Sequence, residues 1–541
     1  MVFIVKKISL RAIDWCTIYF LLGLIFIVNC LNVDFTVNPD LRFLYNRALQ
    51  MYNCISEGNI PYFYYNDFGG VGYGSAFFYG HLTLYPFLPF VKLGLDKFLL
   101  VYSSVTILLT YLGSLTLVKR FTSNYKFISL IYIGSCFALQ IFYTTGTYAN
   151  NFGVALSFFF LAYCIDFFRD NKSFIKATLL FYLIINTHLI TSLLSFLVCC
   201  LLLIVYFDKN RLKDYIKFAI ITCLVCSYFI LNFLYHSDIL TSTTKINETM
   251  LTYAQNSNSN VIGNYMSNTP YLGTIDLIIL SLLNIDLSVS GFRLFNLVTI
   301  FFLVLYLLKR RKSLSKKEFC AIIIVMVLTI ISERNIWLGL NKICLIPFQF
   351  PTRYMHYCIL CTLIICFRYL DSKKVKSILF IFSCCDLILI SAMTNKLTNT
   401  SHYTDLFCQV ENGEYLDESF TWNTNEFYYL SSHVVGDDNV EYSYSLNENT
   451  LFIDYNGSSN NITIPKLYYK GYIAETNDGV VLPIAKGYSQ FINIDVSNID
   501  NCTIVVQYKH PLLFVILDLL CNCMVLVLFW NNVYKNYKKS K

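Results

Sequence analysis

The stretch AIDWCTIYFLLGLIFIVNCL, residues 12–31, is followed almost at once by the polar and aromatic stretch DFTVNPDLRFLYNRALQMYNCISEGNIPYFYYNDFGGVGYGSAFFYG, residues 34–80. About 20 predominantly apolar residues are enough to cross a hydrocarbon core of about 30 Å, so the first stretch predicts a membrane span. The second stretch contains acids, prolines and glycines and cannot be a span. No small-residue cleavage site follows residues 12–31, so we expect a retained anchor that leads into a large loop.

The composition extends this prediction to the whole chain. Of the 541 residues, 56% are hydrophobic and only 14% are charged, whereas a soluble domain holds roughly 25% charged residues. The sequence therefore predicts a mainly α-helical, polytopic membrane protein with about twelve spans. The apolar windows that we interpret as spans are 12–31, 98–118, 127–146, 150–168, 174–189, 190–207, 214–235, 293–308, 319–333, 354–370, 377–393 and 511–531.

The basic residues predict the orientation of these spans. With the N-terminus in the cytoplasm, every inward segment is basic, as the positive-inside rule requires. These segments carry Lys6, Lys7 and Arg11; Lys119, Arg120 and Lys126; Arg169, Lys172 and Lys176; Lys209, Arg211, Lys213 and Lys217; the 309–317 cluster; Arg368 and the 373–376 lysines; and the tail lysines from Lys535 onward. We therefore expect a multi-pass protein of the cell membrane with both termini cytoplasmic. The net charge of +7 then reflects topology and contact with anionic lipid, and not nucleic-acid binding.

Two apolar stretches do not fit this topology as spans. Residues 81–96 contain Pro86 and Pro89, and a span here would place Lys119 outside. We expect these residues to form a membrane-skimming or re-entrant element of the first outer loop. Residues 271–290 present the same problem, and we give them the same interpretation.

One large polar segment, residues 394–508, lies before the last span. Its second half contains alternating runs with Asn-Gly and Asp-Gly turns between some of them, which is typical of antiparallel strands. The runs are LFIDYN at 451–456, NITIPKL at 461–467, GVVLPIAK at 479–486, FINIDV at 491–496 and CTIVVQY at 502–508. The sequence predicts a small extracytoplasmic β-domain of sandwich type. The expected organisation is a transmembrane domain at 1–393 with its first outer loop at 34–97, the β-domain at 394–508, and a last helix with a basic tail at 509–541.

An amphipathic helix is predicted at residues 39–57, because its apolar positions follow the i, i+3, i+4, i+7 spacing. Asn38 can cap this helix, Pro39 suits its first position and Gly58 its end. Asp40 then lies in the first turn, where the helix dipole favours the ionised carboxylate. From spacing alone, Asp40 can either reinforce the cap or take part in chemistry.

Several motifs together resemble a known family. They are Asp40-Leu-Arg-Phe43, Arg47, Gly58, Pro61, Asp67, GYGSAFFY at 72–79, Thr187-His188-Leu-Ile-Thr191, Gln349-Phe-Pro-Thr-Arg353 and Gly413-Glu-Tyr-Leu416. In this order they are similar to bacterial GT-C-type membrane glycosyltransferases, and more narrowly to the YfhO-like group, some of whose members are labelled 6-pyruvoyl-tetrahydropterin synthase-related. The chain departs from the group at three places: Leu44 stands where the family has His, Gly80-His81 where it has Pro-Pro, and Thr352 where it usually has Trp.

The resemblance implies a transferase that moves a sugar from a polyprenyl-phosphate donor to a cell-envelope glycan, lipid or polymer on the outer face. Such chemistry needs a base for the acceptor hydroxyl and cations near the leaving phosphate. The resemblance assigns Asp40 as the base, Asp67 as the second catalytic carboxylate, and Arg47, Arg353 and His188 as groups that bind the donor phosphate. His188 equally suits a structural role in the core. No cofactor is expected, and a divalent metal is left open.

Two further function classes stay open. Asp386 and Asp518 lie inside predicted spans, and acids in a bilayer are usually functional or paired. They favour a transporter or flippase of lipid-linked precursors. The absence of an internal repeat in the sequence and the large β-domain argue against a carrier. The departures from the family motif favour a third class, a non-catalytic envelope assembly protein.

Overall fold

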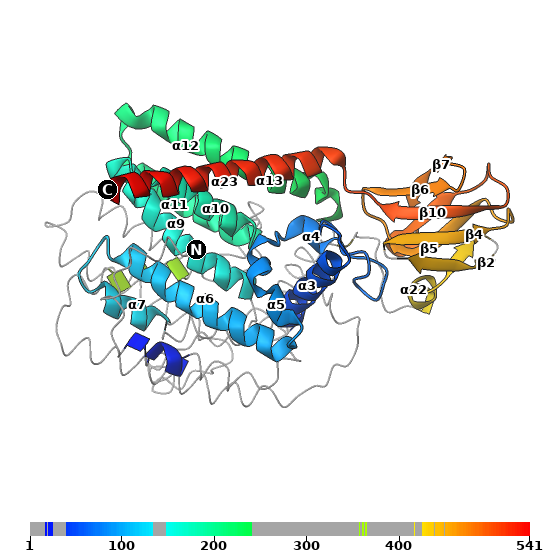
Figure 1. Cartoon of the computed structure of the whole chain (residues 1–541), viewed down its shortest axis with the longest axis horizontal. Coiled ribbons are helices and arrows are strands. Elements are labelled where there is room, and N and C mark those ends of the chain that lie inside the picture. The colour runs from blue at the N-terminus through cyan, green and yellow to red at the C-terminus, as the bar shows by residue number, and fades with distance from the viewer. Residues whose placement is uncertain are drawn as a thin grey trace, which may run out of the picture.

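The computed structural model describes residues 17–18, 20–24, 39–133, 148–240, 356–357, 360–361, 363–364, 416, 425–437, 439–447 and 449–540. The predicted spans 293–308, 319–333 and 377–393, the stretch 271–290 and both Arg353 and Asp386 lie outside these residues, as do most of the spans 12–31, 127–146 and 354–370. Figure 1 shows a body of helices with a β-sheet region at one end and the C-terminus at the opposite end.

Among the described residues, four helices are long and apolar enough to cross a membrane, which is compatible with a membrane protein. They are α6 (Leu95–Val118), α9 (Tyr148–Asp170), α11 (Leu189–Tyr206) and α23 (Leu512–Ser540). They coincide with the predicted windows 98–118, 150–168, 190–207 and 511–531. Long runs of apolar residues therefore located these helices, although two of the windows also contain an acid, Asp166 or Asp518.

Two predicted spans take a different form in the structure. The window 174–189 contains α10 (Phe174–Ile185), whose 12 residues are fewer than a span normally needs. The window 214–235 is broken into α12 (Leu212–Val225) and α13 (Ser227–Tyr235), which meet at 57°. At the break, the Ser227 hydroxyl donates to the Leu224 carbonyl at 2.8 Å and lies 3.3 Å from the Cys521 sulfur of α23. Polar contacts with the last helix therefore accompany the kink.

Further helical segments are described elsewhere in the chain. They are α7 (Tyr125–Ile133), which covers the described start of the predicted span 127–146, and the short η3 (Lys209–Arg211), η4 (Ser237–Leu240), α22 (Asn425–Leu430) and η7 (Tyr488–Gln490).

The helices pack around α9. This helix contacts α6, α10 and α11, and most of its side chains are buried. By contrast, α23 exposes large apolar side chains along its length, among them Leu519, Leu526 and Val527. A stable soluble surface rarely carries so much exposed apolar area in one place, whereas lipid tails accept it. The exposed face of α23 is therefore compatible with contact to a bilayer.

The first loop forms a compact set of short elements against the helices. It begins with α3 (Pro39–Ser56), which agrees with the helix predicted at 39–57. It continues through α4 (Ser75–Phe78), η2 (Leu82–Phe87) and α5 (Leu88–Val91). Residues 82–91 are helical but too short to cross a bilayer, as expected for the 81–96 stretch.

The β region contains two five-stranded antiparallel sheets. The first has the order β2-β1-β5-β9-β8 and the second β3-β4-β10-β6-β7. Their bounds are β1 Val434–Gly436, β2 Glu441–Tyr442, β3 Tyr444–Asn447, β4 Thr450–Tyr455, β5 Asn461–Leu467, β6 Tyr472–Thr476, β7 Val481–Leu482, β8 Ile484–Lys486, β9 Phe491–Asp495 and β10 Cys502–Tyr508. Ile453 pairs with Ile504 in one sheet and Ile462 with Ile494 in the other, and all four side chains are buried. The alternation seen in the sequence thus directs one face of each sheet into the core.

The β region shares its hydrophobic core with the first loop, which the sequence did not reveal. The ring of Phe63 stacks on Tyr508 of β10 with centroids 4.5 Å apart. The Leu467 amide of β5 donates to the Val71 carbonyl at 2.8 Å. Gly74 lies so close to Tyr469 that a Cβ at this position would be 2.5 Å from the ring. The loop and the sheets are therefore packed as one unit.

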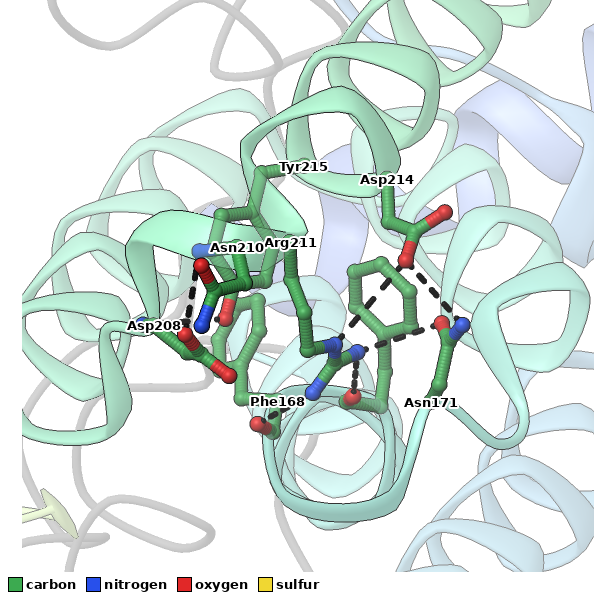
Figure 2. Close-up of polar contacts among 8 residues, drawn as sticks. Phe168, Asn171, Asp208, Asn210, Arg211, Asp214 and Tyr215 are labelled. Carbon is green, nitrogen blue, oxygen red and sulfur yellow. Dashed lines mark hydrogen bonds and ion pairs between the residues drawn. The ribbon is translucent and has the colours of Figure 1, made fainter.

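The opposite end of the helical body is basic and is held by polar contacts. Arg120 of α6 forms an ion pair with Asp166 of α9. Arg211 donates to the carbonyls of Phe167 and Phe168 at the end of α9, at 2.6 and 2.7 Å (Figure 2). Free carbonyls at a helix C-terminus attract a cation, because they carry the negative end of the helix dipole. Arg120 and Arg211, two described basic residues of the predicted inward loops, thus lie at the end of the helices away from the β region (Figure 1).

Candidate functional site

The candidate site lies within the first loop, where Asn46 and Arg47 of α3 contact Asp67 and Gly80. The helix α3 lies at the end of the helical body nearest to the β region (Figure 1). Of the residues that the resemblance assigned, Arg47, Asp67 and His188 are described and buried here. Asp40 occupies the first turn of α3, as predicted, but its side chain lies outside the described part of the chain. Arg353 lies outside it altogether.

Asp67 is a buried carboxyl group, with only 2% of its surface exposed. Its Oδ1 accepts hydrogen bonds from Asn46 Nδ2 at 2.6 Å and from the Phe68 amide at 2.7 Å. Its Oδ2 is buried and has no hydrogen-bond partner among the described residues. Burial raises the pKa of Asp67 to about 6, although both hydrogen bonds act to lower it. One oxygen of this carboxyl group is thus free to accept a proton or a hydrogen bond from a ligand.

The glycine-rich run after Asp67 shapes the loop that carries it. Phe68, Gly69, Gly70 and Gly72 all have positive φ angles, a region that favours glycine. The Gly72 amide returns to the Asp67 carbonyl at 2.9 Å and closes the loop. The run GGVGYG therefore has a conformational role here, which the sequence alone did not show.

Arg47 is a buried cation without a carboxylate partner among the described residues. Its side chain is 2% exposed. One guanidinium nitrogen donates to the carbonyls of Gly80 at 3.1 Å and Tyr79 at 3.4 Å, and the Tyr79 ring centroid lies 4.6 Å from the guanidinium carbon. The Nε has no hydrogen-bond partner in the described structure. An unpaired buried charge is unfavourable by several kcal/mol, on the order of 3–5 kcal/mol, so this geometry favours an anionic ligand.

Asn46, which donates a hydrogen bond to Asp67, directly precedes Arg47 in the sequence. Asn46 and Arg47 are consecutive residues of α3, so one helix position holds the buried carboxyl group while the next supplies the buried guanidinium. Tyr64 is close enough to both Arg47 and Asp67 for each charge to influence its pKa, although burial is the main reason that this pKa is raised. Sequence reasoning had assigned no role to Asn46.

His188 joins the site from the start of α11. Its Nδ1 accepts a hydrogen bond from the Thr191 amide at 3.2 Å and caps the helix. The His188 ring lies 5.8 Å from the ring of Tyr79, which also contacts Arg47. The neighbouring Thr187 hydroxyl donates to Thr83 of the loop at 3.2 Å. His188 and Arg47 therefore share Tyr79 as a neighbour, and His188 also has a structural role as a helix cap.

A close backbone contact holds Gly80, whose carbonyl accepts a hydrogen bond from Arg47, against Asn186, two residues before His188. A Cβ at Gly80 would lie 2.4 Å from the Cα of Asn186, so only glycine allows this approach. Gly80 appeared in the sequence as a departure from the Pro-Pro pair of the family, and the structure shows that its small size is what the packing requires.

Three residues that sequence reasoning had not assigned also line this region. They are His81 in the turn after Gly80, His510 between β10 and α23, and Lys466 of β5. The Nζ of Lys466 is buried beneath the Asp67 loop and donates to the carbonyls of Gly70 at 2.6 Å and Tyr65 at 3.1 Å. No spacing rule could have found them, because the surroundings of each form only when segments far apart in the sequence pack together.

Comparison of the chain with known proteins found no relative. No family model, no curated protein and no solved structure matches the chain. Within the described residues, no group of three or more His, Cys, Asp or Glu side chains could hold a metal ion. The proposed chemistry of the site therefore rests on the burial, charge and hydrogen bonds of Arg47, Asp67 and their neighbours.

Proposed function

We propose that this chain is a membrane glycosyltransferase of the GT-C type, which moves a sugar from a polyprenyl-phosphate donor to a cell-envelope glycan, lipid or polymer. The observation that carries the proposal is that Arg47, a buried cation with no carboxylate partner among the described residues, follows directly after Asn46, which donates a hydrogen bond to the buried carboxyl group of Asp67. One group suits a leaving phosphate and the other suits the transfer of a proton.

The two groups would have distinct tasks in such a reaction. The acceptor hydroxyl must lose a proton as it attacks the anomeric carbon, and a carboxylate within hydrogen-bond reach can take it. The bond between the sugar and the phosphate oxygen breaks, and negative charge develops on the departing lipid phosphate. The planar guanidinium of Arg47 stabilises that charge, because its donors match the geometry of phosphate oxygens. Asp40 in the first turn of α3 stays the proposed base, with Asp67 as the second carboxylate.

The number of spans and the orientation of the chain in the membrane are part of the same proposal. Twelve spans with both termini in the cytoplasm would place the first loop and the β region on the outer face, where lipid-linked sugars are used. The two antiparallel sheets would form a sandwich that covers the loop. The grouping of Arg120, Arg169 and Arg211 at the end of the helices away from the β region supports this orientation.

A lipid-precursor flippase is the second candidate, because Asp518 lies within α23. In the structure, Asp518 accepts hydrogen bonds from Tyr62 at 3.0 Å and Asn522 at 2.9 Å. This acid is therefore paired and ties the first loop to the last helix. The pairing explains Asp518 without proton transport, and it makes the flippase the weaker candidate. A non-catalytic assembly protein would leave the buried charge of Arg47 unexplained.

The proposed role of Arg47 can be tested by transfer assays on the full-length protein. Sugar transfer from a labelled polyprenyl-phosphate donor to an envelope fraction should fall by roughly 10²-fold or more in Arg47→Gln, as expected when one preorganised donor to a developing charge is lost. Arg47→Lys should retain part of the activity, because the charge survives without the fork.

Lys92→Gln is the matched control for this substitution, because Lys92 is an exposed cation of the same loop. It should transfer sugar at the wild-type rate. Equal rates in the wild type and in Arg47→Gln, with both proteins folded, would contradict the proposal.

A further inference from the structure

The acid within α23, Asp518, has no task in the proposed transfer reaction. It is the seventh residue of this helix, about 9 Å along the helix axis from the first. The adjacent Leu519 and Leu520 are exposed, whereas Asp518 makes polar contacts within the protein. An acid inside a membrane span is unfavourable and is usually paired or functional. The partners of Asp518 therefore indicate its role.

Both oxygen atoms of the Asp518 carboxylate accept hydrogen bonds. Oδ2 accepts from the Tyr62 hydroxyl at 3.0 Å, and Oδ1 accepts from Nδ2 of Asn522, one helix turn later, at 2.9 Å. The Oδ1 of Asn522 in turn accepts from the Tyr182 hydroxyl of α10 at 2.8 Å. Every group in this chain donates towards the carboxylate, which accepts hydrogen bonds only. The chain therefore fixes the orientation of Asp518 and leads no proton away from it.

Tyr62 is buried and is held on three sides. Its hydroxyl is bound to Asp518, and its ring stacks on His510 with centroids 4.3 Å apart and an interplanar angle of 16°. The ring of Tyr228 in α13 lies 6.2 Å away on average between centroids. His510 lies between β10 and α23, with its Nδ1 3.4 Å from the Tyr508 hydroxyl. Tyr62 is therefore the point where the first loop contacts α13, α23 and the end of the β region.

The turn that carries Asp67 begins two residues after Tyr62. The Tyr64 carbonyl accepts a hydrogen bond from the Asp67 amide at 3.3 Å. The ring of Phe63 packs against the other end of the turn, since a Cβ at Gly72 would lie 3.1 Å from it. A displacement of Tyr62 would therefore be passed to both ends of the turn through its two neighbours in the chain.

We infer that Tyr62 and Asp518 are positioning residues, which hold the turn with Asp67 at a fixed place relative to the membrane helices. This inference rests on the proposed function, because Asp67 is a proposed carboxylate of the transfer site. It gives Asp518 a task other than proton transport. It also makes the last helix a support of the site, although this helix follows the β region in the sequence. Such support matters because a misplacement of about 1 Å can lower a rate by about 10²-fold.

Hydrogen exchange of the full-length protein in detergent tests the anchor independently of any reaction. Tyr62→Phe and Asp518→Leu each remove the hydrogen bond between the two side chains. The amides of residues 62–73 should then exchange about tenfold faster or more, the typical effect of losing a hydrogen bond to a charged group. Asp518→Asn retains an acceptor for the Tyr62 hydroxyl and should exchange like the wild type. Unchanged exchange in both Tyr62→Phe and Asp518→Leu would overturn the inference.

The transfer assay separates positioning from a general loss of stability. In Tyr62→Phe and Asp518→Leu, kcat should fall by about tenfold, while KM for the donor stays unchanged, because Arg47 is not part of this hydrogen-bond chain. Asp518→Asn should retain most of the wild-type kcat. The double variant should be no slower than the slower single variant, because both changes remove one and the same hydrogen bond. Losses that simply add, or a wild-type kcat in Asp518→Leu, would overturn the inference.

Tyr85→Phe and Asn531→Leu are the matched controls. Tyr85 is an exposed tyrosine of the same loop, and Asn531 is an exposed polar residue of α23. Both variants should exchange and transfer like the wild type. The same losses in these controls would show that the effect is not specific to the contact between Tyr62 and Asp518, and would contradict its role.

Failure of this inference can be told apart from failure of the proposed function. Faster exchange in residues 62–73 of both variants, in a protein that transfers no sugar from any donor, would support the anchor and refute the transferase. Normal exchange and normal kcat in both variants, together with transfer that depends on Asp67, would refute the positioning role alone. Faster exchange with an unchanged kcat would refute it as well.

Discussion

The carboxyl group of Asp67 gives the site its most direct pH dependence. Burial raises the pKa of Asp67 to about 6, and only the ionised form can accept a proton. The ionised fraction is therefore nearly complete above pH 7 and falls to about a tenth at pH 5. If Asp67 takes part as a base, the transfer rate should be constant above pH 7 and should fall about tenfold for each pH unit well below 6.

A pH–rate profile of the full-length protein at saturating donor checks this prediction. The Asn46→Ala variant removes a hydrogen bond that lowers the pKa of Asp67, so its profile should shift to higher pH. A profile that is flat between pH 5 and 8 in the wild type would show that Asp67 does not titrate in the rate-limiting step.

Residue-level features were predictable from the sequence where they depend on local spacing. Asp40 was placed in the first turn of a helix from the Asn-Pro-Asp pattern, and α3 does begin at Pro39. Arg47 and His188 were identified only through the resemblance, and the structure shows both to be buried near Tyr79. His81, His510 and Lys466 were not identified, because their environment depends on contacts between distant segments.

At the scale of elements, strand β5 positions the loop that carries Asp67. Lys466 is 2% exposed, its Nζ bonds two loop carbonyls, and it lies 3.8 Å from the centroid of the Tyr65 ring. Burial lowers the pKa of Lys466 to about 7. The folded state therefore favours the neutral amine, and this group makes folding more favourable as the pH rises from about 7 towards 10.5.

Lys466→Met should release this loop without removing the apolar part of the side chain. We expect faster amide hydrogen exchange in residues 65–72 and a lower transfer rate, because Asp67 loses its fixed position. We also expect the stability gained between pH 7 and 10 to be smaller than in the wild type. Hydrogen exchange followed by mass spectrometry measures the loop directly.

Lys486→Met on the edge strand β8 serves as the control, because Lys486 is exposed. It should leave both the exchange pattern and the transfer rate unchanged. A Lys466→Met protein with the same exchange in residues 65–72 as the wild type would exclude the positioning role.

The elements themselves were predicted to different degrees. Long apolar windows located α6, α9, α11 and α23, because a helix that is apolar on every side needs no knowledge of its neighbours. Alternation located β4, β5, β9 and β10 and the segment that holds β7 and β8, but it did not indicate β1, β2, β3 and β6. The break between α12 and α13 was missed, because it coincides with side-chain contacts to Cys521 of a helix that lies far away in the sequence.

At the scale of the whole molecule, the contacts between loop and sheets join two segments that the sequence treated as separate domains. Phe63 and Val71 of the loop contact Tyr508 and Leu467 of the β region. The predicted domain boundary at residue 394 did not indicate these contacts, because composition shows that a segment is polar but not which other segment it packs against. The division into domains otherwise stays a prediction.

The orientation of the molecule can be tested by labelling single introduced cysteines in intact cells. Asn66 is exposed on the first loop and Asn210 is exposed at the basic end of the helices. Asn66→Cys should react with a membrane-impermeant maleimide from outside, and Asn210→Cys should react only after the cells are opened. The wild-type chain corrects for its native cysteines. Equal labelling of both variants in intact cells would contradict the topology.

The proposed function requires the residues around Arg47 and Asp67 to break the bond between a sugar and a lipid phosphate. The most direct measurement is the polyprenyl phosphate released by the purified full-length protein from polyprenyl-phosphate sugars in the presence of an envelope fraction, quantified by mass spectrometry. We predict release by the wild type and at least about 10²-fold less in Asp40→Asn and Asp67→Asn. Both variants should fold normally, because Asn caps a helix about as well as Asp at position 40, and at position 67 an amide oxygen can still accept from Asn46 and the Phe68 amide. Donor that crosses the bilayer with its sugar bond intact, or equal release in all three proteins, would contradict the account.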